Sequence, residues 1–193
     1  RLRTVTGVQT CALPIWEFTV ATRDRPGLFS MITGVLWARG LNILSADIFT
    51  RESGIALDIL IVERLPDPLH ADALWDRVKG DLMKVLQHSS FLDELLAGKR
   101  KPSLLQNKCV PRKSDRVLID EEASDFYTII EVYTWDRPGV LHAITHTLYQ
   151  LEVSIQLAKI STPGAQVTDV FYVTDLSGNK LNDYDLHETI GRA

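Results

Sequence analysis

Two stretches far apart in the chain alternate between apolar and polar residues, which is the pattern of half-buried β-strands. In residues 17–22 the apolar side chains Phe18 and Val20 fall on one face, and residues 128–134 repeat the pattern from Ile130 onward. The sequence therefore predicts a first strand in each of two units.

Each predicted strand is followed by apolar residues at the spacing of an amphipathic helix. These residues are Leu28, Ile32, Val35 and Leu36 in the first unit and Leu141, Ile144 and Leu148 in the second. A hairpin with glycine in its turn comes next. Its strands are residues 42–50 and 55–63 in the first unit and residues 154–162 and 166–174 in the second. In the first unit we expect a second helix to begin near Ala71 and to extend toward Leu96, before Gly98 ends it.

These elements belong to an internal repeat. The tetrapeptide Asp-Arg-Pro-Gly occurs at residues 24–27 and again 112 residues later, at residues 136–139. The same offset aligns Phe18 with Ile130, Ile32 with Ile144, Thr33 with Thr145, Leu36 with Leu148 and Ile48 with Ile160. After a one-residue deletion, Asp58 aligns with Asp169. The order strand, helix, strand, strand, helix, strand predicts an α+β fold with two ferredoxin-like βαββαβ domains in tandem.

The domain limits follow from these elements. We assign residues 16–98 to the first domain and expect a short strand at residues 116–120 to complete its sheet. We assign residues 126–193 to the second domain, which we expect to be incomplete because the chain ends soon after a helix predicted from Asp185. Residues 99–115 form a basic linker, which is either a solvated tether or a segment that docks onto an acidic neighbour.

The first fifteen residues stand apart from both domains. Residues 5–15, VTGVQTCALPI, resemble the translation of a sequencing-adapter oligonucleotide and lack the apolar core of a signal peptide. We interpret residues 1–15 as a non-native leader, with a short disordered leader as the alternative.

Composition narrows the function classes. With 21 basic and 25 acidic residues the formal net charge is −4, which argues against nucleic acid as a partner. No apolar run approaches the roughly 20 residues of a membrane span, so we expect no membrane association. Cys11 and Cys109 form no metal-binding motif, and such sparse cysteine favours a cytoplasmic location.

The repeated Asp-Arg-Pro-Gly motif lies between a strand and a helix. Because proline suits the first helical position, we expect the helices to begin at Pro26 and Pro138. Asp24 and Asp136 would then cap the first amides of these helices. A second interpretation is that the glycine of each motif leaves backbone amides open to the carboxylate of a small ligand. The spacing alone does not choose between the two.

The motif, followed by a helix and by Gly40-Leu41-Asn42-Ile43 at the start of a strand, resembles the ACT domain, a regulatory module that binds small molecules. The segments FTVATRDRPGLFSMITGVLWARGLNILSADIFT, RVLIDEEASDFYTIIEV and AKISTPGAQVTDVFYVTDLSG resemble the C-terminal tandem ACT region of bacterial bifunctional uridylyltransferase/uridylyl-removing enzymes of the nitrogen regulatory protein PII. This resemblance implies a region that senses glutamine and shifts the parent enzyme from attaching UMP to PII toward removing it.

Carried over residue by residue, the resemblance implies an amino-acid site in each copy. The implied contacts are Asp24, Pro26, Gly27, Leu28 and Asn42 in the first copy and Asp136, Pro138, Gly139, Val140 and Ser154 in the second. We expect the ligand at a junction between ACT modules and regulation by population shift. The alternatives are an ACT-type dimerisation module without a ligand and an amino-acid sensor of another ACT-containing enzyme.

The sequence contains none of the common catalytic motifs for phosphate-binding loops, serine nucleophiles or zinc hydrolases. We therefore expect the catalytic domains of the parent enzyme, with their Mg²⁺, to lie upstream, and no catalytic residue, metal or cofactor in this region. His142 and His146, four residues apart, are a metal pair, part of a pocket rim or ordinary surface histidines. For Asp58 and Asp169, in mid-strand, we expect a hydrogen bond on the sheet face rather than catalysis.

Overall fold

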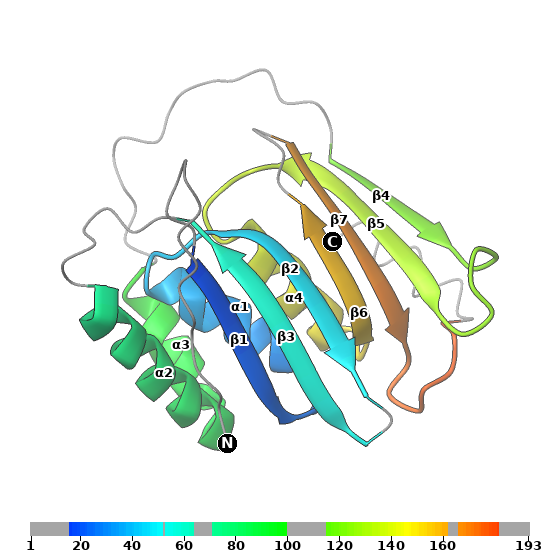
Figure 1. Cartoon of the computed structure of the whole chain (residues 1–193). Coiled ribbons are helices and arrows are strands. Elements are labelled where there is room, and N and C mark those ends of the chain that lie inside the picture. Colours follow the sequence, from blue (N-terminus) through cyan, green and yellow to red (C-terminus); the bar gives the residue numbers. More distant parts are fainter. Residues whose placement is uncertain (1–15, 52, 64–70, 100–114, 162–165, 182–193) are drawn as a thin grey trace.

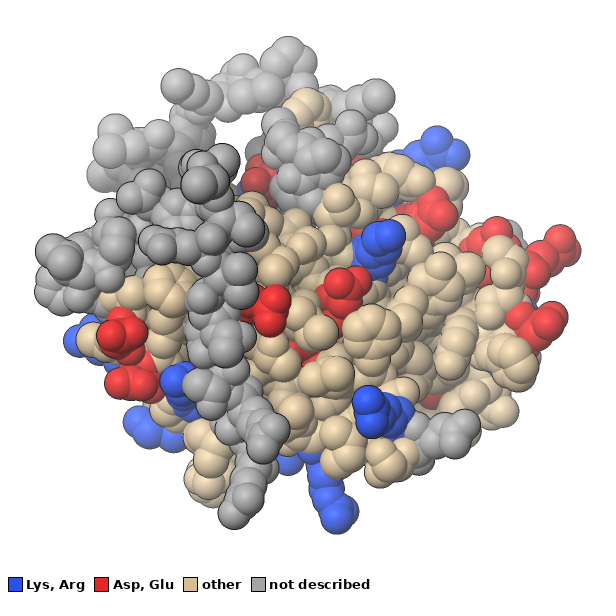
Figure 2. Space-filling view, in the orientation of Figure 1, with Lys and Arg blue, Asp and Glu red and all other residues tan. Residues whose placement is uncertain are grey.

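The computed structural model describes residues 16–51, 53–63, 71–99, 115–161 and 166–181. Within these ranges, seven strands form one sheet in the order β1-β3-β2-β6-β7-β5-β4, and every neighbouring pair is antiparallel. The helices lie together on one face of this sheet (Figure 1). On the other face, the acidic and basic side chains of the described residues are scattered (Figure 2).

Every helix and strand predicted within the described residues is present. The first repeat contains β1 (Trp16–Arg23), α1 (Leu28–Ala38), β2 (Ile43–Thr50), β3 (Ile55–Val62), α2 (Ala71–Gln87) and α3 (Ser90–Ala97). After it come β4 (Arg116–Asp120), β5 (Thr128–Trp135), α4 (Val140–Gln150), β6 (Ser154–Ser161) and β7 (Gln166–Thr174). The second helix predicted for the first repeat is thus divided into α2 and α3.

Each repeat has the ferredoxin-like strand arrangement, with its third strand between its first and second. The two halves join edge to edge through β2 and β6, where Ile48 lies opposite Ala158 and Ala46 lies opposite Ile160. This confirms the predicted fold class and makes one continuous sheet from two repeats.

The short strand β4 corrects one expectation. It does not complete the sheet of residues 16–98, because it pairs with β5, placing Val117 opposite Val132 and Ile119 opposite Ile130. In the sheet order, β4 and β1 lie at opposite edges. The alternation in residues 116–120 predicted a strand but not its partner, since either repeat offers an apolar surface for Val117 to cover.

The two helices that follow the motif begin later than expected. The starts are Leu28 and Val140 in place of Pro26 and Pro138. In the first repeat, the Leu28 N–H donates to the Arg25 carbonyl at 3.1 Å, and Gly27 has a φ of 74°. A type II turn has this geometry, with proline at its first corner and glycine at its second. The second repeat has the same turn, so proline and glycine shape the approach to the helix rather than its first turn.

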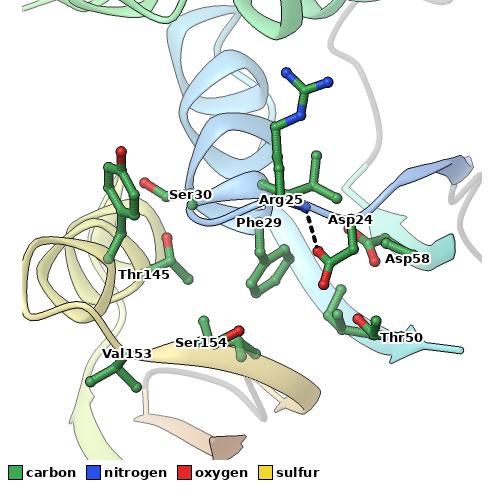
Figure 3. A pocket seen from close by; sticks show the side chains of 15 residues that line it. Asp24, Arg25, Phe29, Ser30, Thr50, Asp58, Thr145, Val153 and Ser154 are labelled. Carbon is green, nitrogen blue, oxygen red and sulfur yellow. Dashed lines mark hydrogen bonds between the residues drawn. The ribbon is translucent and has the colours of Figure 1, made fainter. Parts of the chain in front are cut away.

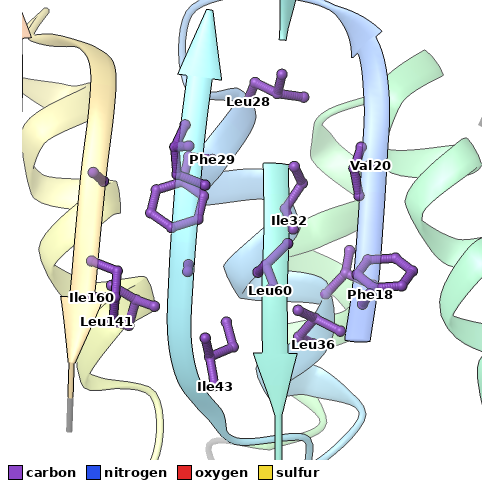
Figure 4. Packing of buried hydrophobic residues seen from close by; sticks show 14 of the residues in the cluster. Phe18, Val20, Leu28, Phe29, Ile32, Leu36, Ile43, Leu60, Leu141 and Ile160 are labelled. Atoms are coloured by element: carbon purple, nitrogen blue, oxygen red, sulfur yellow. The ribbon is translucent and has the colours of Figure 1, made fainter. Parts of the chain in front are cut away.

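The hydrophobic core lies between the sheet and the helices (Figure 4). Ile32 and Leu36 of α1 and Leu60 of β3 are fully buried in it. On the far side of α1, Trp75 of α2 stacks on Phe18 of β1 with 5.3 Å between ring centroids. Among the described residues, no helix is long and apolar enough to cross a membrane.

Three predictions fall outside the described residues. These are the leader at residues 1–15, residues 100–114 of the linker and the helix expected from Asp185. They stay predictions.

Candidate ligand pockets between the two repeats

The repeats meet where α1 and α4 pack against each other. A Cβ atom added at Gly27, before α1, would lie 2.7 Å from the ring of Tyr149 near the end of α4. A Cβ atom added at Gly139, before α4, would lie 2.4 Å from the ring of Trp37 near the end of α1. Gly27 and Gly139 are equivalent positions of the repeat, and so are Trp37 and Tyr149. The junction therefore has approximate twofold symmetry. The aromatic rings reach the motif only because glycine has no side chain there.

The centre of this junction is polar. The hydroxyl oxygens of the equivalent residues Thr33 and Thr145 lie 3.0 Å apart, and both side chains are buried. Because equivalent residues face each other here, this contact marks the approximate symmetry axis.

His142 also belongs to the junction. Its ring stacks on Trp37 with 5.7 Å between centroids, and its Nδ1 lies 3.1 Å from the Ser30 carbonyl oxygen. Burial lowers the pKa of His142, which favours the neutral ring. The surface interpretation is therefore wrong for His142, whereas His146 is half-buried beside it. The described residues contain no cluster of three or more His, Cys, Asp or Glu side chains that could bind a metal ion.

Two pockets open beside the junction, and each is lined by both repeats. The first pocket is lined by Asp24, Arg25, Gly27 and Leu28 of the turn and by the Asp58 side chain. The second repeat contributes Thr145, Tyr149 and Ser154 (Figure 3). Its volume, open mouth included, is about 420 Å³.

The second pocket is the repeat-related counterpart of the first. Asp136, Gly139 and Asp169 line it from the second repeat, and Trp37 and Asn42 line it from the first. Its volume on the same measure is about 390 Å³. Both pockets thus combine the motif of one repeat with the helix end and following strand of the other.

The structure redistributes the predicted contacts. Asp24, Gly27 and Leu28 lie together in the first pocket, and their counterparts Asp136, Gly139 and Val140 lie together in the second. Asn42 was predicted in the first set and Ser154 in the second, but the structure places each in the pocket of the opposite repeat. Pro26 and Pro138 stand at the corners of the turns and do not line these pockets.

The predicted helix caps are also wrong. The residues directly before the helices are Gly27 and Gly139, and neither helix has a side-chain cap. Asp24 Oδ1 instead accepts a hydrogen bond from the Arg25 N–H at 2.8 Å, within the turn. Burial raises the pKa of Asp24 against the effect of this bond. Burial also raises the pKa of Asp136, and the Glu63 carboxylate adds to the increase.

Two buried carboxyl groups in the pockets have few partners. Asp58 is 1% exposed and neither of its side-chain oxygens has a hydrogen-bond partner. Asp169 is 0% exposed, and only its Oδ1 accepts a hydrogen bond, from the Ser161 N–H at 3.4 Å. The predicted sheet-face hydrogen bond is therefore absent at Asp58 and long at Asp169. Burial, with a smaller contribution from the nearby motif carboxyls Asp24 and Asp136, raises the pKa of each to about 7.

Asp58 and Asp169 were not predicted as site residues, although the sequence contains a signal for this role. An acidic residue recurs at the same repeat position in two otherwise apolar strands. Because charged side chains are rarely buried without a partner, such recurrence favours a shared role in a site.

Comparisons with known proteins agree with the architecture. The second repeat matches an ACT domain. Residues 123–193 match the family described as the ACR family N-terminal ACT domain. The chain is also 39% identical over 168 residues to the bifunctional uridylyltransferase/uridylyl-removing enzyme of Rhodospirillum rubrum and 39% identical over 176 residues to that of Azospirillum brasilense.

The enzyme of Bradyrhizobium diazoefficiens is 33% identical over 175 residues. These matches cover 86–87% of this chain but only 18% of each enzyme, so the chain corresponds to a small part of their length. A solved aspartate kinase from Synechocystis is similar at a TM-score of 0.44 and 17% identity, covering 84% of this chain and 24% of that one. By these matches the second repeat is an ACT domain, and the chain is homologous to a small part of the bifunctional enzymes.

Proposed function

We propose that this region senses a free amino acid, glutamine, for a cytoplasmic bifunctional uridylyltransferase/uridylyl-removing enzyme that acts on PII. The observation that carries the proposal is the pair of repeat-related pockets, each of which requires both repeats. The homology to part of these enzymes supports a regulatory role rather than a catalytic one. Any metal ion of the parent enzyme would belong to its catalytic domains.

The ends of the pockets suit the two ends of an amino acid. Phe29 and Ser30 lie in the first turn of α1, where the helix supplies no acceptor for their N–H groups and carries a partial positive charge. An α-carboxylate is stabilised at such a position. Ser154 in the first pocket and Asn42 in the second offer a hydroxyl and an amide for hydrogen bonds to the glutamine side chain.

A ligand in either pocket touches both repeats and therefore distinguishes arrangements of the α1–α4 junction. Its binding favours the arrangement that it fits better, by the difference in its affinity for the two. In the parent enzyme this shift would favour removal of UMP from PII over its attachment.

Isothermal titration of the 193-residue chain with glutamine, glutamate and asparagine tests this proposal. We expect saturable binding that is tightest for glutamine. The variant Ser154→Ala should bind roughly 5-fold more weakly to the first pocket, since one hydrogen bond contributes about 1 kcal/mol. Ser161→Ala, an exposed position on the same strand, is the matched control and should bind as the unmodified chain does. Absence of binding by a chain that circular dichroism shows to be folded would contradict the proposal.

A further inference from the structure

Each pocket is lined by a buried aspartate from the third strand of a repeat. Asp58 lies on β3 opposite Val20 and Ile48, and it points from the sheet toward the helices, because the alternate residues Ala56 and Leu60 are buried on the same face. In Figure 3, Asp58 lies beside Asp24, across the pocket from Thr145. Asp169 has the equivalent place on β7.

Among the described residues, no Lys or Arg side chain forms an ion pair with Asp58 or Asp169. Arg25 lines the first pocket, but it is exposed and its Nη1 donates to the Leu86 carbonyl oxygen. Arg137 lines the second pocket, and its Nη1 lies 4.0 Å from the exposed Asp115 carboxylate. A buried carboxyl oxygen without a hydrogen-bond partner is unfavourable, and packing alone does not explain why one recurs in both pockets.

We propose that Asp58 and Asp169 bind the ammonium group of the ligand, so that each pocket takes a zwitterionic α-amino acid with its cationic end on the aspartate and its carboxylate at the helix start. This inference rests on the proposed function and deepens it by naming the anchor and the ligand class. An ammonium group supplies three donors to a carboxylate that has free acceptor sites. A ligand without a positive charge would leave the aspartate unsatisfied and bind weakly.

The proposal includes a proton. In the ligand-free pocket, burial holds the pKa of Asp58 and Asp169 near 7, so each carboxyl is partly protonated at neutral pH. A bound ammonium group stabilises the carboxylate, and the carboxyl proton passes to the buffer. The other titratable groups lining the first pocket are Asp24, Arg25 and Tyr149. Those lining the second are Asp136, Arg137 and His142, with Glu63 close to Asp136.

The test uses the isosteric variants Asp58→Asn and Asp169→Asn, singly and together, in the whole chain. Glutamine is compared with glutaramate, which is glutamine without its α-amino group. We expect the unmodified chain to prefer glutamine by about 10- to 100-fold, the range of a charge-assisted hydrogen bond. The double variant should lose this preference. Asp47→Asn, an exposed aspartate on the other face of β2, is the control and should keep it.

Titrations at pH 6 in two buffers with different ionisation enthalpies give the number of protons released. We expect release in the unmodified chain and none in the double variant. A double variant that binds glutamine as tightly as the unmodified chain overturns this inference and leaves the proposed function standing. If the unmodified chain binds no amino acid, the proposed function itself fails.

Discussion

The two pockets share an equivalent buried aspartate but differ in other side chains that line them. Asp58 and Asp169 occupy equivalent places, but Ser30 in the first pocket is replaced by His142 in the second. His142 and its stacking partner Trp37 fill space in the second pocket with rings. The repeat therefore determines where each buried carboxyl group lies, and the surrounding side chains make the two pockets unequal in shape and polarity.

The repeats also differ in how their sheets are covered. In the first, Trp75 of α2 packs on Phe18. In the second, the equivalent residue Ile130 borders an apolar hollow of about 640 Å³, open mouth included, together with Val117 and Ile144. Among the described residues, no helix occupies the place that α2 has in the first repeat.

The largest effect is expected from the buried carboxyl groups and their dependence on pH. The folded chain keeps the protons of Asp58 and Asp169 up to about pH 7, whereas an unfolded aspartate loses its proton near 3.8. Because the folded state binds more protons between these values, the free energy of unfolding falls as the pH rises through this window. At about 1.4 kcal/mol per pKa unit, the loss for one carboxyl is at most about 4 kcal/mol at pH 8.

Asp58→Asn should remove this loss and raise the stability at pH 8 while changing little at pH 4. Asp169→Asn should give a gain of similar size, because the pKa of both carboxyl groups is raised to about 7. Urea unfolding at both pH values measures the difference. Equal stability of the unmodified chain and Asp58→Asn at pH 8 would refute the expectation.

The next largest effect separates the two glycine-to-ring contacts. Gly139→Ala should destabilise the chain by about 3 kcal/mol, since it combines a positive φ of 82° with a close approach to Trp37, which is held by His142. Gly27→Ala should cost less, about 1–2 kcal/mol, because Tyr149 is 41% exposed and can move away. Thermal or urea unfolding provides the measurement.

Gly54→Ala is the matched control for this pair. Gly54 has a positive φ of 70° but no atom near its added Cβ, so it reports the backbone cost alone, about 1 kcal/mol. If Gly139→Ala costs no more than Gly54→Ala, the Trp37 contact has no energetic weight.

The sequence predicted elements well because local spacing determines them. The alternation around Phe18 and the helical spacing of Ile32 each depend on one face being buried, whichever element covers it. The partner of β4 was not predictable from residues 116–120, since strand pairing is a long-range choice between two similar edges. The late helix start was within reach, because a Pro-Gly pair is the signature of a type II turn.

The sequence predicted several of the residues that line the pockets, but not which residues of the two repeats line the same pocket. The motif predicted Asp24 and Gly27 as site residues. The sequence around Ser154 and Asn42, however, does not show that Ser154 lines the first pocket and Asn42 the second. That exchange follows from the approximate twofold packing of α1 on α4, which brings the end of one helix to the start of the other. Residue spacing in the sequence does not reveal that the two repeats pack with approximate twofold symmetry through α1 and α4, and this packing determines which residues share a pocket.

A smaller effect concerns the helix ends that precede β2 and β6. Gly40 has a φ of 78°, and its counterpart Glu152 takes the same left-handed conformation with a φ of 58°. Because a side chain is strained there, Glu152→Gly should stabilise the chain by about 1 kcal/mol, and Gly40→Ala should destabilise it by a similar amount. Unfolding midpoints that move in the same direction for both variants would contradict this view of the strain.

The smallest effect is expected at the symmetry axis itself. Thr145 Oγ1 lies 2.9 Å from the Leu141 carbonyl oxygen and Thr33 Oγ1 lies 3.1 Å from the Ser30 carbonyl oxygen, so each hydroxyl keeps an acceptor if the other is removed. Thr33→Val and Thr145→Val should each cost about 0.5–1 kcal/mol, and the double variant should cost less than their sum, since either single variant already removes the contact between the two hydroxyls. A double-mutant cycle measures this coupling. Strict additivity would mean that the 3.0 Å contact between the two hydroxyls does not stabilise the junction, and that the two helices are held by their ring and glycine contacts alone.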